Sequence, residues 1–363
     1  MKTYLFKTAL VALTVTQLFI ACSEDNEITP DARGRFENGV LVINEGNFGG
    51  SNGSISFYDQ DSNKVILDVF QNNNNGAIIG ATVISTTIIE ENAFIVTNNP
   101  DKIELVSLEN FSAITNSIIS DDLVQPRQMV IAGNKAFITC WGGFSENFTL
   151  PDSYLAVMDL QTFEITKKID IGDGAEGIIL AADKIFVADN YSNTISIIDP
   201  DTESLIDQVE VLERPENFVM DVDGNLWIAC EGPLFGEPEG GLVYFDPVNE
   251  DVINSWVSPE NAPVGKIAIN GAGNAVFYLT GAAYPDPGTD IFMMEINATS
   301  LPSSPVVSGQ NYYGLGIDPD DGNIYIGDAA GFSIDGNVLI YSNAGEFIEE
   351  FEAGRGPSDF KFL

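Results

Sequence analysis

A short apolar segment recurs seven times along this chain of 363 residues, and this repeat limits the fold more than any other feature. Each copy ends in a small or polar residue and continues into a loop rich in Gly, Asn or Pro, which is typical of a β-strand. The spacing of the copies, from 41 residues (Phe186 to Trp227) to 53 residues (Leu41 to Phe94), matches one four-stranded propeller blade. The second residues of the seven copies are Leu41, Phe94, Phe137, Phe186, Trp227, Phe277 and Tyr325.

The segments around each copy keep one order: an upstream strand, a tight turn, the repeated strand, a loop of variable length, and a hairpin. The clearest hairpin has Asp199-Pro200-Asp201 at its turn. No stretch keeps a helical period, so we predict an all-β chain that forms a seven-bladed β-propeller over residues 39–363. A β-solenoid or an open pair of sandwiches is the alternative.

The upstream strands begin with a lead-in turn that contains Pro or a small residue, as in Gln125-Pro126-Arg127. The first copy has no such strand before it. The same pattern occurs at the other end of the chain, where Arg355-Gly356-Pro357 leads into alternating Phe360 and Phe362. We therefore predict that blade one is closed by the C-terminal strand.

The N-terminal region has the pattern of an export signal. Residues 1–21 combine a basic start with an apolar run, and Phe19-Ile20-Ala21-Cys22 resembles the lipobox of bacterial lipoproteins, with Phe where Leu is usual. The acidic tract after Cys22 resembles the signal that directs Bacteroidota lipoproteins to the cell surface. We expect a signal peptide over 1–21, lipidation at Cys22, a tether over 22–38, and a location on the outer face of the outer membrane. A plain secretory signal is the alternative.

Charge and composition exclude several classes of function. Acidic residues outnumber basic ones 54 to 15, and a net charge of −39 repels nucleic acids and anionic lipids, so we expect contact with a membrane only through the lipid anchor. The chain contains no histidine, which removes Ser-His and Cys-His nucleophile pairs and His-ligated zinc. We expect no cofactor and no metal, because Asp-rich turns such as Asp318-Pro319-Asp320 lack the spacing of a calcium loop.

Two cysteines occupy the same repeat position in blades that are not adjacent. Cys140 and Cys230 each follow an aromatic anchor by three residues. Equivalent positions in separate blades exceed the distance that a disulfide can bridge, so we predict two free, buried thiols.

The lead-in turns and the loops after the repeated strands are expected to emerge on one face around a central channel. These loops carry aromatic residues outside the strand period, and all three propeller arginines fall in lead-in turns, which favours a recognition surface. The alternative is that the loops pack their own rings and that each arginine pairs with a carboxylate such as Glu213, Glu216 or Asp359. The predicted ligand-binding residues are Phe48, Arg127, Trp141, Phe144, Phe148, Tyr191, Arg214, Phe235, Tyr284, Tyr312, Tyr313, Phe332 and Arg355.

A catalytic site would need several carboxylates at the channel mouth. The second residue after each lead-in Pro, or its equivalent, is predicted to lie there, and only one of these residues is acidic. One carboxylate is too few for a metal-dependent site unless Glu176 and Glu216 also turn inward. We therefore predict that the protein is not an enzyme. The predicted mouth residues are Gln128, Gly177, Asn217, Gly265, Gly314 and Asp359.

The repeats IFVADNYSNTISIIDP and LWIACEG resemble those of YVTN or YncE-like seven-bladed propellers over about residues 39–363. Within this class, fold, size and anchoring are similar to the Bacteroidota surface lipoproteins that bind cobalamin. This resemblance implies a monomer that captures a small molecule, cobalamin in that case, for a TonB-dependent transporter. The alternatives are a calcium-dependent lactonase-like propeller and an adhesion module that binds protein or glycan.

Overall fold

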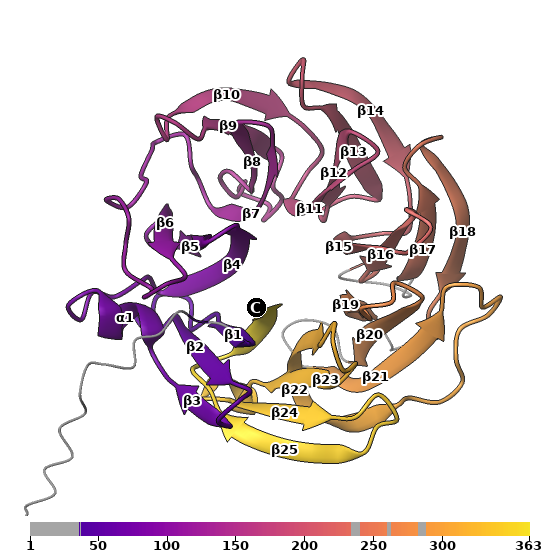
Figure 1. Cartoon of the computed structure of the whole chain (residues 1–363). Helices are drawn as coiled ribbons and strands as arrows, with labels where there is room; N and C mark the ends of the chain where they lie inside the picture. Colours follow the sequence, from indigo (N-terminus) through magenta and orange to yellow (C-terminus); the bar gives the residue numbers. More distant parts are fainter. Residues whose placement is uncertain (1–35, 37, 234–239, 260–262, 282–287) are drawn as a thin grey trace, which may run out of the picture. The chain divides into compact units, whose positions relative to one another are not determined.

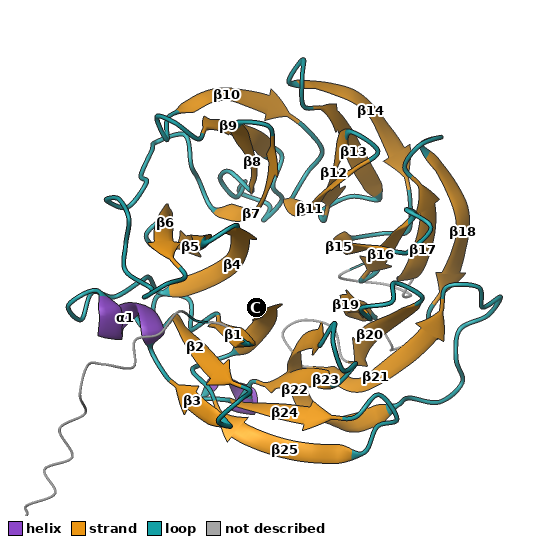
Figure 2. Cartoon of the chain, viewed as in Figure 1, coloured by secondary structure: helices purple, strands orange, loops and turns teal. Residues whose placement is uncertain are grey.

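Strands β1 to β26 make up most of the part of the chain that the computed structural model describes, namely residues 36, 38–233, 240–259, 263–281 and 288–363. The predictions of a signal peptide, of lipidation at Cys22 and of a tether lie outside these residues, apart from Phe36 and Asn38. Figure 2 shows that strands joined by loops predominate. The helical segments among the described residues are the short helix α1 (Val69–Asn73) and the 3₁₀ turn η2 (Ala330–Phe332).

The strands form six hydrogen-bonded sheets among the described residues. The first is β26 (Pro357–Phe362), β1 (Gly39–Asn44), β2 (Ser54–Asp59) and β3 (Lys64–Ile66). The second is β4 (Thr82–Ile89), β5 (Asn92–Asn98) and β6 (Lys102–Ser107). The third is β7 (Pro126–Ala132), β8 (Lys135–Cys140), β9 (Tyr154–Asp159) and β10 (Ile165–Asp170). The fourth is β11 (Ala175–Ala181), β12 (Lys184–Asp189), β13 (Thr194–Asp199) and β14 (Ser204–Glu210).

The fifth sheet is β15 (Pro215–Met220), β16 (Leu226–Cys230), β17 (Gly241–Asp246) and β18 (Asp251–Val257). The sixth has seven strands: β19 (Val264–Ile269), β20 (Ala275–Gly281), β21 (Gly288–Glu295), β22 (Val307–Ile317), β23 (Ile324–Asp328), β24 (Asn337–Tyr341) and β25 (Phe347–Glu352).

The difference between six sheets and seven predicted blades comes from β22. The first part of this long strand pairs with β21, as in Ile291↔Val307, and its second part pairs with β23, from Tyr312↔Asp328 to Ile317↔Ile324. The seven-stranded sheet therefore contains two repeat units that share one strand. Every predicted repeat segment is the second strand of its unit, which confirms the repeat period seen in the sequence. The number of sheets alone does not give the number of blades.

The unit Gly34–Leu363, taken by itself, is a β-propeller, as predicted. In Figure 1 the sheets are arranged radially, with β4, β7, β11, β15 and β19 nearest the axis and β3, β10, β14, β18 and β25 at the rim. Apolar side chains join neighbouring sheets: Phe186 of β12 and Phe245 of β17 have ring centroids 5.7 Å apart. Trp227 of β16 lies in one core cluster with Val276 and Tyr278 of β20. The repeated aromatic anchors are thus the main contacts between blades.

The C-terminal strand completes the first blade, as predicted. β26 pairs antiparallel with β1, with Val42 opposite Phe360 and Val40 opposite Phe362. The Phe360 side chain is 5% exposed and lies against Gly316 and the ring of Tyr325. The two ends of the propeller are therefore joined by main-chain hydrogen bonds and by a shared apolar core.

Both propeller cysteines are free and buried, which confirms the prediction for Cys140 and Cys230. They belong to separate core clusters, so no bridge between them is sterically available. Within the described ranges, no helix has the length and apolar character needed to cross a membrane.

Replacing Phe360 with Ala should lower the free energy of unfolding by about 3–5 kcal/mol, because the ring fills the core where the chain ends meet. The matched control is Phe347→Ala on the outer strand β25, where the ring is 56% exposed and the expected loss is under about 1 kcal/mol. Chemical denaturation of both variants measures the difference. Equal losses would mean that closure of blade one does not limit stability.

Candidate functional site

A β-bulge occurs near the start of the inner strand in every repeat unit. The register shifts lie between Val83 and Ser85, Pro126 and Met129, Ala175 and Ile178, Pro215 and Asn217, Val264 and Lys266, Tyr312 and Gly314, and in the pairing of β26 with β1. A bulge leaves an extra residue unpaired and changes the direction of its side chain. The bulged positions include Arg127, Glu176, Glu216, Gly265 and Tyr313, so the same end of the inner strands carries an unusual set of charged and polar groups.

The lead-in turns are fastened to the loops that follow the repeated strands. In five units the residue before the inner strand has a left-handed backbone, with φ of 50° to 75°. Its carbonyl oxygen accepts a hydrogen bond from the first residue after the repeated strand, as in Trp141 to Gln125 (3.1 Å) and Glu231 to Arg214 (2.9 Å). The five left-handed residues are Gln125, Gly174, Arg214, Asn311 and Gly356. We call the end of the propeller that holds them the lead-in end.

Arg127 links the third and fourth blades at the lead-in end. Its Nε lies 2.8 Å from Oε2 of Glu176, which is almost fully buried, and its guanidinium carbon lies 4.1 Å from the ring centroid of Trp141. Burial alone would lower the pKa of Arg127, but the charge and hydrogen bond of Glu176 raise it. The guanidinium therefore stays charged, and it supports the indole ring from one side.

Three aromatic rings gather beside this ion pair. Trp141 and Phe144, which follow β8, contact Tyr191, which follows β12, in edge-to-face geometry, with centroid separations of 5.9 to 6.4 Å. The backbone of Gly174 packs directly against the Tyr191 ring, where a Cβ would lie only 2.6 Å from Cδ2. The indole Nε1 of Trp141 is buried and has no hydrogen-bond partner among the residues that the structure describes. We call these three rings the aromatic cluster.

Arg214 occupies the left-handed position of the fifth unit and binds two neighbours. Its Nη2 lies 2.6 Å from Oε2 of Glu231 and 3.3 Å from Oδ1 of Asn190. The Nδ2 of Asn190 in turn donates to Oε2 of Glu216 at 2.7 Å. The buried Nε of Arg214 has no hydrogen-bond partner within the described ranges. The fourth and fifth blades are thus connected by alternating charged and amide groups.

Lys266 is the cation that the sequence analysis missed. Within the described residues, its Nζ has no carboxylate oxygen within 4.0 Å. Burial lowers its pKa, but the surrounding carboxylates, Glu216 first, raise it overall. Burial, followed by the charges of Glu231 and Glu176, raises the pKa of Glu216 to about 8. Burial also raises the pKa of Glu231, despite the opposing effect of Arg214.

These groups form one continuous set, which we call the polar arc. It runs across the third to sixth blades. It includes Glu176 and Glu216, the two carboxylates that the sequence analysis considered as additional groups for a catalytic site if they turned inward. The charge of Glu176 is one of the causes that raise the pKa of Glu216, which indicates that the two carboxyl groups lie close enough to interact. The members of the polar arc are Arg127, Glu176, Asn190, Arg214, Glu216, Glu231 and Lys266.

A second group lies at the junction of the first and seventh blades. Tyr313 donates a hydrogen bond to Oε2 of Glu45, and its ring packs edge-to-face on Phe332 at 4.9 Å. Arg355 binds Asp335 at 3.2 Å and the carbonyl oxygen of Phe332 at 3.1 Å. Each arginine of the predicted site therefore has a carboxylate partner, but the partners are Glu176, Glu231 and Asp335, not the Glu213, Glu216 and Asp359 that the sequence suggested.

The remaining predicted site residues divide into three cases. Phe48 and Phe148 are 88% and 79% exposed and contact no other ring in the described part of the chain. Tyr312 was wrongly placed on the binding face: it is 2% exposed in a core cluster, because strand alternation directs it inward while the bulge directs Tyr313 the other way. Phe235 and Tyr284 lie outside the described residues.

The predicted register of the sixth inner strand was also wrong by one residue. Val264, not Pro263, is equivalent to Pro126 and Pro215, so the mouth position belongs to Lys266 and not to Gly265. Glu45 and Glu231 were missed as well. Both follow a repeated strand at the place that Trp141 and Asn190 take in other units, so a strict alignment of the repeats could have identified them.

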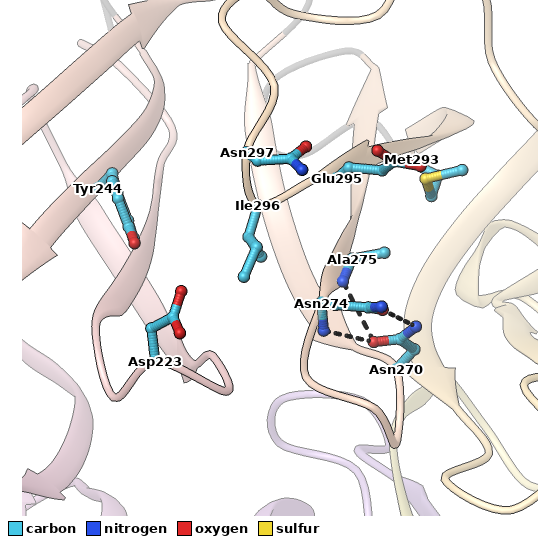
Figure 3. Close-up of a pocket in the computed structure, with 9 residues that line it drawn as sticks. All are labelled: Asp223, Tyr244, Asn270, Asn274, Ala275, Met293, Glu295, Ile296 and Asn297. Atoms are coloured by element: carbon cyan, nitrogen blue, oxygen red, sulfur yellow. Dashed lines mark hydrogen bonds between the residues drawn. The ribbon is translucent and has the colours of Figure 1, made fainter.

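A pocket of about 660 Å³ lies at the opposite end of the strands, between the fifth and sixth units. Figure 3 shows Asp223 and Tyr244 on one wall and Asn270, Asn274 and Ile296 across from them. Asn270 and Asn274 bond to each other at 2.8 Å, so their amides hold the turn. Among the described residues, no group of three or more His, Cys, Asp or Glu side chains has the geometry to hold a metal ion.

Comparison with known families gives a match over almost the whole propeller. The model of a domain of unknown function, DUF5074, matches residues 38–353. The chain belongs to this family. The DUF5074 match ends before β26, the strand that closes the first blade. A comparison with proteins of curated function finds no match.

Solved structures resemble this DUF5074 chain in fold. A periplasmic gluconolactonase from Pseudomonas aeruginosa has a TM-score of 0.65 at 12% identity, covering 90% of this chain and 99% of that one. A quinonprotein alcohol dehydrogenase-like protein from Bacteroides thetaiotaomicron has a TM-score of 0.64 at 15% identity, and the match covers 90% of this chain and 78% of that one. A functionally unknown protein from Desulfotomaculum acetoxidans has a TM-score of 0.62 at 14% identity, covering 90% and 99%. The expected resemblance holds for the propeller fold, and the cobalamin-binding type stays a prediction.

Replacing Glu216 with Gln should remove a pH-dependent loss of stability. The folded pKa of about 8 lies above the ordinary value of 4.5, so as pH rises between these values the unfolded chain loses the Glu216 proton while the folded chain keeps it. The free energy of unfolding therefore falls across this window, and Gln cannot contribute to that fall. The free energy of unfolding of the variant, relative to that of wild type, should rise by on the order of 2 kcal/mol between pH 5 and pH 9.

The measurement is the difference between variant and wild type at each pH. Burial also raises the pKa of Asp189, to about 7, and the pKa of Glu231, so the wild-type curve alone would mix three carboxyl groups. A difference that stays constant from pH 5 to pH 9 would contradict the raised pKa of Glu216.

Proposed function

We propose that the protein is a non-catalytic binding protein, held at the cell surface by lipidation of Cys22, which captures a small organic molecule at the lead-in end of the propeller. The observation that carries this proposal is the aromatic cluster beside the polar arc. Its edge-to-face rings are backed by an ion-paired guanidinium, so their positions are fixed before a ligand arrives. Preformed aromatic surface next to hydrogen-bonding groups is typical of small-molecule sites.

The exposed rings around the cluster support the same proposal. Phe144 is 45% exposed although it contacts Trp141, and Phe148 extends from the same loop into solvent. Large exposed aromatic residues rarely serve stability, and they are common where a partner is bound. Transfer of the captured ligand to a TonB-dependent transporter is part of this proposal, and the family resemblance makes cobalamin the first molecule to test.

The propeller lacking residues 1–33 should be titrated calorimetrically with cobalamin, calcium and a panel of oligosaccharides. For any molecule that binds, Trp141→Ala should weaken the affinity at least about tenfold, because the indole is the centre of the cluster. Phe347→Ala is the matched control, since it removes an exposed ring from β25 at the rim.

Two results would overturn the proposal. One is the absence of any binding that depends on Trp141. The other is turnover of a lactone in the same samples, measured by acid release, since this would assign the carboxylates of the polar arc to catalysis.

A further inference from the structure

Three hydrogen-bond donors at the lead-in end lack an acceptor among the described residues. The Nε1 of Trp141 and the Nε of Arg214 are buried and unpaired, and Lys266 Nζ has no carboxylate oxygen within 4.0 Å. Buried polar groups in folded proteins are almost always paired with protein or with water, so unpaired ones call for an explanation. Two buried unpaired donors, together with a lysine that has no ion pair among the described residues, indicate that a ligand with acceptor atoms completes the site.

Acceptors are also available in the same region. Glu231 directs Oε2 to Arg214, while its Oε1 lies 3.9 Å from the position that a Cβ on Gly265 would take. Apart from its two chain neighbours, no other described residue comes within 4 Å of that position, so the missing side chain leaves space beside Oε1. Glu216 uses Oε2 to accept from Asn190, which leaves Oε1 for another partner. The ligand therefore has to donate as well as accept.

Two of the three cations of the polar arc already have carboxylate partners. Arg127 is paired with Glu176, and Arg214 is paired with Glu231. Lys266 is the remaining cation, and it has no ion pair among the described residues. A cationic ligand would add to the charge of Lys266, and an anionic ligand would face a chain with a net charge of −39. A neutral ligand avoids both costs.

The donors and acceptors form a connected path. Trp141 contacts Tyr191 at 6.2 Å, and the charge of Arg214 acts on Tyr191. Arg214 binds Glu231, whose free oxygen faces Gly265 next to Lys266. The path therefore leads, contact by contact, from the rings of the third and fourth blades to the lysine of the sixth.

We propose that the lead-in end binds a neutral saccharide, with one sugar face on the aromatic cluster and hydroxyl groups on Trp141 Nε1, Arg214 Nε, Lys266 and the free carboxylate oxygens. Hydroxyl groups both donate and accept, and the apolar face of a sugar ring packs on aromatic side chains. This inference rests on the proposed capture of a small molecule and names the class of that molecule.

The test uses neutral cello-, malto-, manno- and xylo-oligosaccharides, their uronic acid counterparts, and cobalamin. For the neutral sugar that binds, Trp141→Phe should weaken binding about five- to tenfold, because it keeps a ring but removes the Nε1 donor. Lys266→Met should have a similar effect. Lys184→Met is the matched control and should stay within about twofold, since Lys184 pairs with Glu250 on the fourth and fifth sheets away from the lead-in end.

The salt dependence of the affinity distinguishes a neutral ligand from a charged one. Affinity for the neutral sugar should change less than about twofold between 50 mM and 500 mM sodium chloride, whereas binding driven by charge would weaken markedly. Cobalamin binding that depends on Trp141, with no binding of any neutral sugar, would overturn this inference and leave the proposed function intact. No Trp141-dependent binding of any probe would overturn both.

Discussion

The pairing of β26 with β1 is the interaction on which the rest of this propeller depends. Each blade packs its apolar anchors on the next, so an open ring would expose two large apolar faces to water. The chain avoids this by bringing residues from its two ends into one sheet, where Val42 stands opposite Phe360. Closure also brings Arg355 and Gly356 beside Glu45 and Gly46, so the lead-in end is completed by the same contact.

The chemical character of the lead-in end follows from the repeated bulge. In a regular strand, successive side chains alternate between the two faces of the sheet. The extra residue in each inner strand interrupts this alternation and presents Arg127, Glu176, Glu216 and Tyr313 at equivalent places around the axis. Because the backbone geometry repeats while the side chains differ, one structural device yields a site with cations, carboxylates and a phenol.

The sequence predicted the fold well because its signals are local and repeated. Strand length, turn residues and the anchor period identified all seven repeated strands, and the Arg355-Gly356-Pro357 turn identified the closing strand. The site was harder to predict, since a bulge has no clear sequence signature and displaces the side-chain register by one. This explains why Lys266 was missed and why Tyr312 was placed on the wrong side. Arg127 pairs with Glu176 of the next blade, and local patterns do not encode such a contact between blades.

The shared strand β22 bears on the order in which the propeller folds. The sixth and seventh units are joined by hydrogen bonds along β22, between segments that are close in sequence. The first blade is joined by contacts such as that of Gly354 with Asn44, whose sequence separation is 310 residues. Contacts between nearby residues cost less chain entropy and form earlier than those between distant ones. The seven-stranded sheet can therefore form from contacts that are local in sequence, whereas the first blade cannot be completed until the two ends of the propeller meet.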